Sequence, residues 1–266
     1  MSKIKKVKIF INQNDKSRVV ANQLKKELIE YQFEIVENNY DLAISVGGDG
    51  SFLRMVRDSE FNENIYYIGI NSGSLGFLQE IDIDHTIDFV QRLCNDDYKI
   101  EDISIQETKI ITNNQIYEYQ SLNEIVVRNK DFNVLKVPVF VDDEFLEQFS
   151  GDGILFSTST GTTAYNMSFG GSIVYNTLDT LSITPIAPLN NKVYKTLPNS
   201  VIIPCNKMVS FEGSDDLNLF IQIDGVNHMI DHVKKLETKV GNKNIHCIRM
   251  NDFHFIKVLN NKMLEK

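Results

Sequence analysis

The sequence predicts an α/β amino-terminal domain with a parallel, Rossmann-like sheet, followed by a mainly antiparallel, all-β carboxy-terminal domain, and so an α+β chain overall. Two observations predict this fold. Over about the first hundred residues, apolar runs of strand length alternate with helical patterns, which is typical of a parallel sheet with covered faces. Beyond that point the apolar runs are short and separated by turn residues, which is typical of antiparallel meanders.

The first half of the sequence contains largely apolar strands that alternate with helical patterns. The residues Val19, Val20, Leu24, Leu28 and Ile29 recur at helical spacing, so a helix is expected there. The predicted strands cover residues 7–12, 33–36, 41–46 and 65–70, and the predicted helices cover 16–31, a segment ending near residue 57, and 82–93.

The second half contains two hairpin signals. Alternating valines lead to Asp142-Asp143, and the alternating run at 219–223 leads to Asp224-Gly225, a strong hairpin turn. The predicted strands are 103–112, 115–119, 124–128, 134–149, 154–157, 201–203, 208–211, 219–223, 236–240 and 245–250. We expect domains at 1–99 and 100–248, with the apolar segment 249–266 packing back on the first domain.

A glycine-rich loop follows the strand at 41–46 and opens a helix. It reads Gly47-Gly48-Asp49-Gly50-Ser51. Glycines allow a positive φ and a close approach of the backbone to a ligand, and a helix start offers unpaired N–H groups that suit phosphate. A phosphate loop with one carboxylate in it suggests phosphoryl transfer. Arg54, about one turn further on, is placed to meet phosphate or to be ion-paired or solvated.

A second glycine-containing segment, 150–168, interrupts the β-rich half. It contains Gly151-Asp152-Gly153, a short strand and then a dense run of Ser and Thr that ends at Tyr165. Hydroxyls can bind sugar or phosphate oxygens, and an aromatic ring offers a flat face to a base. The segment therefore favours a nucleoside ligand.

Composition narrows the function classes. A net charge of −9 and a pI near 5.1 argue against a nucleic-acid binder, which usually carries a basic face. The three cysteines show no CxxC spacing, and no apolar run has the length of a signal peptide or membrane span, so we expect a cytoplasmic protein without a membrane partner. His228 and His232 lie in a β-rich region, where this spacing does not place them on one helical face, so no metal site is assigned to the protein's own side chains.

Four ordered motifs make this chain resemble the bacterial type of NAD kinase. They are Gly47–Ser51, the loop Gly73-Ser-Leu-Gly-Phe77, the pair Asn123-Glu124, and the segment from Gly151 to Tyr165. The resemblance implies ATP or polyphosphate as donor, a divalent ion (most often Mg²⁺ with ATP), NAD as acceptor, and a homodimer or homotetramer. The chain departs from the family pattern at two positions. Ser159 stands where proline is usual, and the loss of the proline's φ constraint would loosen the turn. Val226 stands where many members carry a polar residue.

The resemblance also implies roles for individual residues. Asp49 would be the general base toward the 2′-hydroxyl of the adenosine ribose of NAD, and Gly47, Gly48, Gly50 and Ser51 would bind the donor's phosphates. Asp152 would reach NAD from a neighbouring subunit. The full set implied to bind NAD is Asp49, Gly50, Arg54, Asn123, Glu124, Asp152, Thr163, Ala164, Tyr165, Asn166, Met167, Ser168 and Ala187.

Competing interpretations remain at the level of sequence. Asp49 could only cap a helix, Asn123-Glu124 could be a surface turn, and Tyr165 could belong to the core. Diacylglycerol and sphingosine kinases share a GGDG loop but lack the hydroxyl-rich segment, and phosphofructokinases keep βα alternation throughout a longer chain. A non-catalytic nucleotide sensor is the alternative of another class. There is no Gly-x-x-x-x-Gly-Lys-Ser/Thr loop and no Gly-x-Gly-x-x-Gly fingerprint.

Overall fold

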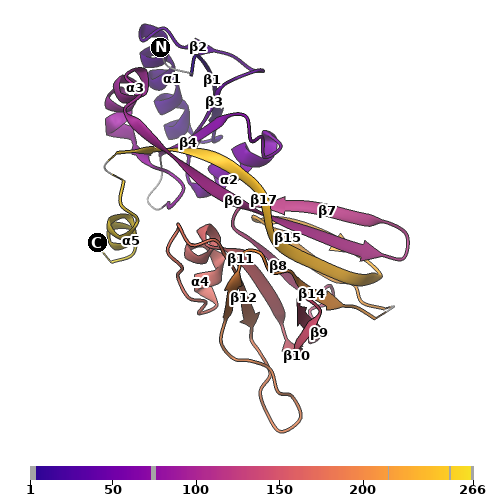
Figure 1. Cartoon of the computed structure of the whole chain (residues 1–266). Coiled ribbons are helices and arrows are strands. Elements are labelled where there is room, and N and C mark those ends of the chain that lie inside the picture. The colour runs from indigo at the N-terminus through magenta and orange to yellow at the C-terminus, as the bar shows by residue number, and fades with distance from the viewer. Residues whose placement is uncertain (1–3, 73–75, 215, 252, 265–266) are drawn as a thin grey trace. The chain divides into compact units, whose positions relative to one another are not determined.

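The computed structural model describes residues 4–72, 76–214, 216–251 and 253–264. The chain divides into two compact units, one of residues 1–103 and 244–266 and the other of residues 104–243. Two long strands, β6 (Tyr98–Thr112) and β17 (Val233–Met250), run through the points where the chain passes from one unit to the other (Figure 1). Within each unit β6 and β17 lie close together, as the contacts Asp102–His246 and Thr108–Thr238 show.

The first unit is built on a parallel sheet with the order β17-β4-β3-β1-β2. Helix α1 starts after Asn14, whose side chain accepts a hydrogen bond from the N–H of Ser17 at 2.8 Å. The strands are β1 (Lys6–Ile11), β2 (Glu34–Ile35), β3 (Leu42–Gly47), β4 (Tyr66–Asn71) and β5 (Ile81–Asp82), and the helices are α1 (Asp15–Glu30), α2 (Asp49–Asp58), α3 (Thr86–Cys94) and α5 (Phe255–Met263), with a 3₁₀ turn at Ile83–His85.

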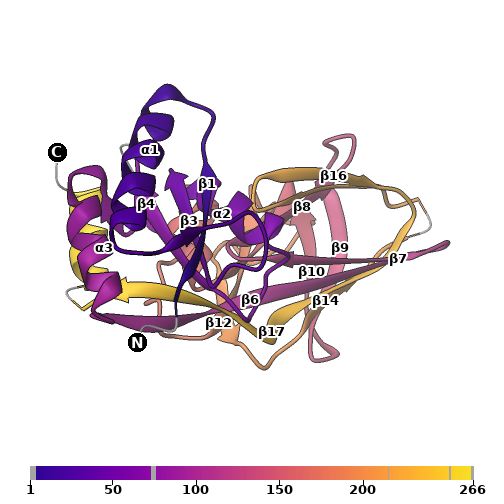
Figure 2. The ribbon, with the colours of Figure 1, turned by 90° about the horizontal axis from the view of Figure 1, so that it is seen from above.

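The core of this unit confirms three of the five apolar positions predicted for the first helix, whereas Val19 and Ile29 are exposed. Val20, Leu24 and Leu28 of α1 are buried in one cluster with Phe89, Val90 and Leu93 of α3 and with side chains of the sheet. Figure 2 shows α1 and α3 on the same side of β1, β3 and β4. β3 is buried along its whole length, and its sequence is apolar except for Ser45. The sheet therefore presents the end of β3, and the loop after it, at a fixed edge.

The second unit is mainly antiparallel β, as the sequence predicts. One sheet has the order β13-β12-β11-β8-β15-β16, and β10, β9, β14, β17, β6 and β7 supply the other strands. A single core draws residues from both groups, for example Phe156 of β11 and Phe211 of β14. The strands are β7 (Ile116–Ser121), β8 (Glu124–Asn129), β9 (Leu135–Val141), β10 (Glu144–Gly151), β11 (Gly153–Thr158), β12 (Thr180–Ile186), β13 (Val201–Pro204), β14 (Val209–Glu212), β15 (Leu219–Ile223) and β16 (Val226–Ile230), with a 3₁₀ turn at Thr160–Thr163 and the short helix α4 (Tyr165–Ser168).

Both predicted hairpin turns are confirmed, and one predicted break is wrong. Asp142-Asp143 and Asp224-Gly225 have positive φ at both positions, the geometry that joins two antiparallel strands tightly. The segments 236–240 and 245–250, predicted as two strands, belong to one continuous strand, β17. The residues between them looked like a turn, but contacts to β6 continue on both sides of Gly241, at Thr238 and at His246.

Candidate active site

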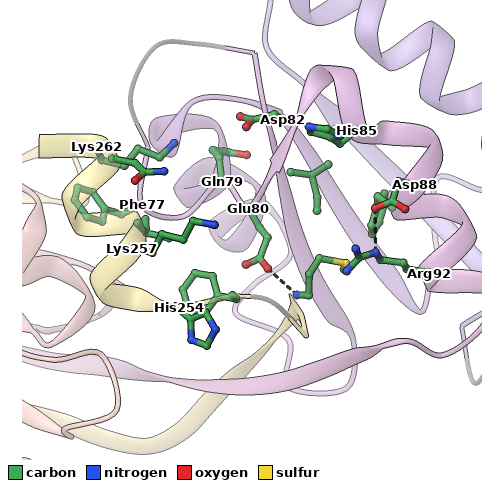
Figure 3. A pocket seen from close by; sticks show the side chains of 16 residues that line it. Phe77, Gln79, Glu80, Asp82, His85, Asp88, Arg92, His254, Lys257 and Lys262 are labelled. Atoms are coloured by element: carbon green, nitrogen blue, oxygen red, sulfur yellow. Dashed lines mark hydrogen bonds and ion pairs between the residues drawn. The ribbon is translucent and has the colours of Figure 1, made fainter. Parts of the chain in front are cut away.

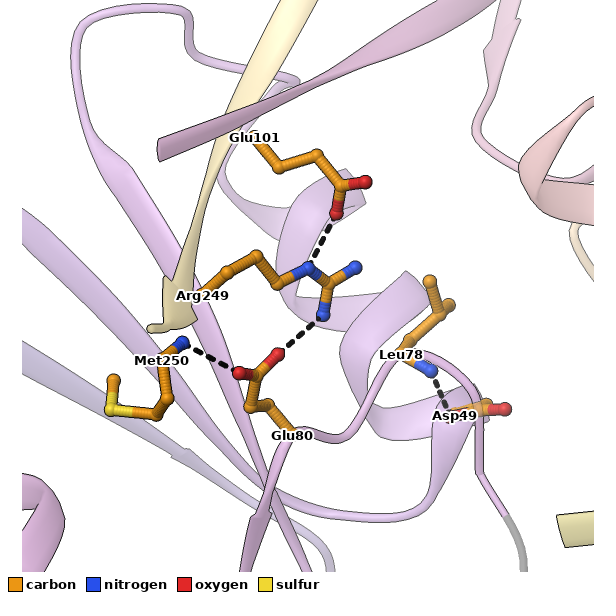
Figure 4. Close-up of polar contacts among 6 residues, drawn as sticks. All are labelled: Asp49, Leu78, Glu80, Glu101, Arg249 and Met250. Carbon is orange, nitrogen blue, oxygen red and sulfur yellow. Dashed lines mark hydrogen bonds and ion pairs between the residues drawn. The ribbon is translucent and has the colours of Figure 1, made fainter. Parts of the chain in front are cut away.

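Asp49 is the first residue of α2 and its carboxylate is held by backbone N–H groups. The N–H of Phe77 donates to Oδ2 at 2.8 Å and the N–H of Leu78 donates to Oδ1 at 3.0 Å (Figure 4 draws the second). Gly76 lies against the same carboxylate, and a Cβ there would stand 2.7 Å from Oδ1. Asp49 is thus oriented by a neighbouring segment rather than free in solvent. The preceding residues 73–75 of the loop lie outside the described residues.

Burial raises the pKa of the Asp49 carboxyl above its ordinary value. The N–H groups of Phe77 and Leu78 and the positive charge of Lys262 on α5 act in the opposite direction, because they stabilise the carboxylate. An aspartate with a raised pKa is a stronger base than an exposed one. The structure therefore supplies a reason, which the sequence does not, why this particular carboxylate can accept a proton from an alcohol.

The glycines of the loop differ in what they do locally. A Cβ at Gly47 would collide with Ser51, with its Oγ only 2.2 Å away, whereas a Cβ at Gly48 or Gly50 would meet nothing within 4 Å. We expected glycine in this loop either because the backbone has a positive φ or because a ligand approaches the backbone closely. None of the three has a positive φ, so the first reason is wrong. The second reason fits Gly48 and Gly50, whose backbone is open. No side chain caps the amino-terminus of α2.

Two further side chains fix the loop. Gln79 is buried and donates from Nε2 to the carbonyl of Gly48 at 2.7 Å, although sequence reasoning did not single it out. Arg54 is half-buried, and its guanidinium donates to the carbonyl of Ile11 at 2.9 Å, where β1 ends. Arg54 is thus tied to the edge of the sheet on which the loop lies.

A buried ion network lies next to Gln79. Glu80 accepts from Arg249 Nη1 at 2.9 Å and from the backbone N–H of Met250 at 2.6 Å, and Arg249 Nε donates to Glu101 at 2.5 Å (Figure 4). The side chains of Glu80 and Arg249 are only 5% and 10% exposed. Sequence reasoning missed this network, because its members are far apart in the chain and are ordinary charged residues in the sequence.

A cavity of about 450 Å³ lies beside this network, between the segment 77–92 and the residues that lead into and form α5. Figure 3 shows Lys257, Lys262 and His254 facing Glu80, Asp82 and His85 across it. Asp88 is paired with Arg92 at 2.9 Å, and Glu80 with Arg249, so two of the acidic groups here are already neutralised. The cavity lies wholly within the first unit.

In the second unit, Asn123 and Glu124 are held at the start of β8 by Asp224. The Asp224 carboxylate accepts from the backbone N–H groups of Leu122, Asn123 and Glu124 at 2.7, 2.9 and 3.1 Å. The sequence marked Asp224 only as a turn residue. Asp224 has a positive φ in the hairpin turn that follows β15, and β15 pairs with β8. The role of Asp224 could therefore be inferred only after the pairing of these two strands was known.

Asn123 and Glu124 carry buried acceptor atoms without a partner. Asn123 Oδ1 and Glu124 Oε2 are both buried and accept no hydrogen bond. Such atoms cost free energy in the absence of a ligand that donates to them. Burial raises the pKa of Glu124 to about 8, with the negative charge of Asp224 adding to the effect and the backbone N–H of Tyr165 opposing it.

Stability is expected to depend on pH through Glu124. Its folded pKa of about 8 lies above the ordinary value of 4.5, so the folded protein holds a proton that the unfolded chain releases. The free energy of unfolding should therefore fall as the pH rises from about 4.5 to about 8, by at most about 1.4 kcal/mol per pH unit. Urea unfolding at pH 5, 6.5, 8 and 9 measures this slope. Glu124→Gln should flatten it, Glu118→Gln on β7 should not, and equal slopes in wild type and Glu124→Gln would contradict the assignment.

The hydroxyl-rich segment is organised mainly by its own hydrogen bonds. Thr158 Oγ1 donates to the carbonyl of Leu122 at 2.6 Å, and Thr162 and Thr163 donate to the carbonyls three residues earlier. Ser159 has a φ of −55°, which proline also adopts, and its hydroxyl is hydrogen-bonded to Leu178 and Thr180. The turn is thus held rather than loosened by the serine, contrary to the expectation from its sequence.

The remaining predicted residues fall into two groups. Tyr165 is 37% exposed, accepts from Arg128 at 3.5 Å and packs edge-on against Phe169, so it is not a core residue. Asn166 is fully buried, with contacts to Thr162, Ser172 and Thr184, and it supports the segment. The residues at or near the surface are Asp152, Ala164, Met167, Ser168 and Ala187.

Comparison with known families assigns the chain. The model of the ATP-NAD kinase N-terminal domain matches residues 4–98, and that of the ATP-NAD kinase C-terminal domain matches residues 122–249. The chain belongs to the NAD kinase family. It is 36% identical over 263 residues to the NAD kinase of Finegoldia magna, with 95% of this chain and 96% of that protein covered. It is 30% identical over 239 residues to NAD kinase 1 of Listeria innocua, covering 89% and 90%.

Solved structures of NAD kinases share the fold. Yeast NADH kinase, complexed with NADH, matches with a TM-score of 0.84 at 20% identity, covering 97% of this chain and 86% of that one. The NAD kinase of Archaeoglobus fulgidus, in complex with ATP, matches with a TM-score of 0.74 at 18% identity, covering 98% and 99%. These matches confirm the predicted fold class.

The described part of this NAD kinase contains neither a metal-binding cluster of side chains nor a membrane-spanning helix. Among the described residues, no three His, Cys, Asp or Glu side chains gather in a way that could hold a metal ion. In that same part of the chain no helix has the length and apolarity required to cross a bilayer.

Proposed function

We propose that the protein transfers the γ-phosphoryl group of ATP, or a phosphoryl group of polyphosphate, to the 2′-hydroxyl of the adenosine ribose of NAD, which yields NADP. The observation that carries the proposal is the half-buried, doubly hydrogen-bonded carboxylate of Asp49 at the uncapped start of α2, between two glycines with open space beside them. Membership of the NAD kinase family supports the same reaction.

Asp49 is proposed to orient the hydroxyl and accept its proton. The hydroxyl oxygen forms a bond to the γ-phosphorus while the bond from that phosphorus to the bridging oxygen breaks, and ADP leaves. Since phosphoryl transfer passes through a loose transition state in most analyses, the proton can leave late, and positioning contributes much of the rate. Gly47, Gly48, Gly50 and Ser51 are proposed to bind the donor's phosphates, with Arg54 nearby.

A divalent ion, Mg²⁺, is proposed to arrive with ATP. The ion would be held by phosphate oxygens and water, and Asp49 is the carboxylate that the glycine loop offers. When bound, the ion would neutralise charge on the phosphates.

The NAD-binding residues are proposed to lie mainly in the second unit. The unpartnered acceptors Asn123 Oδ1 and Glu124 Oε2 fit ribose hydroxyl donors, and the exposed ring of Tyr165 fits a stacking partner. Asn166 is proposed to act by supporting this surface. The other proposed contacts are Gly50, Asp152, Thr163, Ala164, Met167, Ser168 and Ala187.

A donor-resolved assay tests reaction, acceptor and donor together. Purified protein with Mg²⁺ and NAD is supplied with ATP or with polyphosphate, and NADP is measured through an NADP-specific dehydrogenase. NADP formation with either donor supports the proposal. Phosphorylation of diacylglycerol or sphingosine in place of NAD would favour a lipid kinase, and NAD binding without any transfer would favour a sensor.

A cytoplasmic location and domains at 1–99 and 100–248 are proposed from the sequence pattern. Family resemblance supports assembly into a homodimer or homotetramer in which Asp152 reaches the NAD of a neighbour. Light scattering on a sizing column measures the assembly. Mixing an inactive Asp49→Asn chain with an Asp152→Ala chain then checks whether the two complement each other.

A further inference from the structure

We propose that Arg249 is a positioning residue for the Asp49 carboxylate, acting through Glu80 and the segment 77–80. This inference rests on the proposed function of Asp49 in phosphoryl transfer. It assigns a part in the reaction to the end of β17, about 200 residues away in the sequence, where neither a motif nor a spacing pointed to one.

The contacts form a continuous chain. Asp49 is gripped by the N–H groups of Phe77 and Leu78 at 2.8 and 3.0 Å. Two residues later the chain reaches Glu80, whose two carboxylate oxygens accept from Arg249 Nη1 and from the N–H of Met250 (Figure 4). The segment that orients Asp49 is therefore anchored at its far end to β17. Residues 77–80 belong to no regular strand or helix, and the N–H of Glu80 also donates to the carbonyl of Gly69 on β4 at 3.0 Å.

Arginine suits this anchor better than lysine would. Its planar guanidinium presents several donors in a fixed fork, so it contacts Glu80 through Nη1 and Glu101 on β6 through Nε at the same time. The ring of Phe253 covers the guanidinium, with its centroid 4.5 Å from Cζ. Two carboxylates, one backbone N–H and one aromatic ring thus fix both members of the Glu80–Arg249 pair.

A polar pair that only stabilises the fold would need no link to the segment 77–80. The neighbouring hydrogen bond between His246 Nδ1 and Asp102 joins β17 to β6 at 2.6 Å, and among the described residues no hydrogen bond connects this pair to those that hold Asp49. The contrast between the two pairs on the same two strands provides a matched control.

Two variants test the proposal. In Glu80→Gln, an NH₂ group replaces one of the two carboxylate oxygens and cannot accept a hydrogen bond. The side chain therefore keeps either the Met250 bond or the Arg249 bond but loses the other. In Arg249→Met combined with Glu80→Gln, the guanidinium is removed from the anchor without leaving an unpaired carboxylate at position 80, and the amide oxygen there can keep only the bond from the N–H of Met250. Asp102→Asn is the control.

We expect kcat to fall about 10-fold in Glu80→Gln and about 30-fold or more in the double variant, with KM for NAD and for ATP within about 3-fold of wild type, because positioning acts on the transition state. Hydrogen exchange at Phe77 and Leu78 should be at least about 10-fold faster in the double variant. Asp102→Asn should change neither kcat nor exchange at these residues.

A folded double variant with a kcat within 2-fold of wild type would overturn the proposal, and so would unchanged exchange at Phe77 and Leu78. The exchange readout does not depend on turnover. A wild-type protein that forms no NADP would therefore count against the proposed function, while the link from Arg249 to the segment 77–80 would still be judged by exchange.

Discussion

Replacement of Asp49 by asparagine is expected to lower kcat for NADP formation by about 10³-fold or more, and to leave the Kd for NAD within about 3-fold. Asparagine has nearly the same shape but cannot accept a proton from the ribose hydroxyl, and general-base groups typically contribute 10²–10⁴-fold. The substitution also turns one side-chain oxygen into an NH₂ that faces the N–H of Phe77 or Leu78, so one of the two orienting bonds is lost.

Steady-state kinetics and calorimetric titration of NAD measure the two quantities separately. Asp58→Asn, at the exposed end of the same helix, is the matched control and should behave like wild type. A kcat for Asp49→Asn within 10-fold of wild type would rule out the general-base role. A parallel loss of NAD binding would instead indicate that Asp49 serves mainly to bind the acceptor.

Replacement of Gly161 by alanine is expected to destabilise the protein by about 3 kcal/mol or more. A Cβ at this position would stand 2.0 Å from the carbonyl oxygen of Asn123 and 2.4 Å from its carbon. That carbonyl accepts from the N–H of Thr158 at 3.0 Å, so it cannot move without disturbing the start of β8. Overpacking against backbone that is fixed in this way ranks among the more damaging substitutions.

Urea unfolding measures the loss, and titration of NAD tests whether the displaced Asn123-Glu124 pair lowers affinity as well. Gly50→Ala is the control for stability, because a Cβ there meets nothing within 4 Å and alanine favours a helix by about 1 kcal/mol. If Gly161→Ala unfolded at the same urea concentration as wild type, this result would contradict the close packing of Gly161 against the Asn123 carbonyl.

The sequence predicted well whatever depends on local pattern. The buried strand β3, the stripe of α1 and the turn at Asp224-Gly225 each follow from apolar spacing or from glycine and aspartate chemistry over a few neighbouring residues. Residue order alone therefore located the loop at Asp49 and the segment that ends at Tyr165.

The sequence failed where a function depends on tertiary contact. Asp224 accepts hydrogen bonds from residues 122–124, about 100 positions away in the chain. Arg249 is paired with Glu80, about 170 positions away. No local sequence pattern near Asp224 or Arg249 predicts these partners. Hydroxyls such as that of Thr162, which looked available to a ligand, are satisfied by carbonyls of their own turn, a result that depends on the backbone path.

The end of β17 has a consequence for how the protein is made. The first unit takes its strand next to β4, through His246 and Cys247, from residues that the ribosome adds long after the rest of this sheet. Although the glycine loop is made early, β4 lacks one sheet neighbour, and Glu80 lacks its partner, until residues 246–249 have been added. A nascent chain therefore holds Asp49 long before Arg249 can anchor the segment that orients it, and termination between residues 51 and 249 yields a polypeptide with the loop but without its anchor.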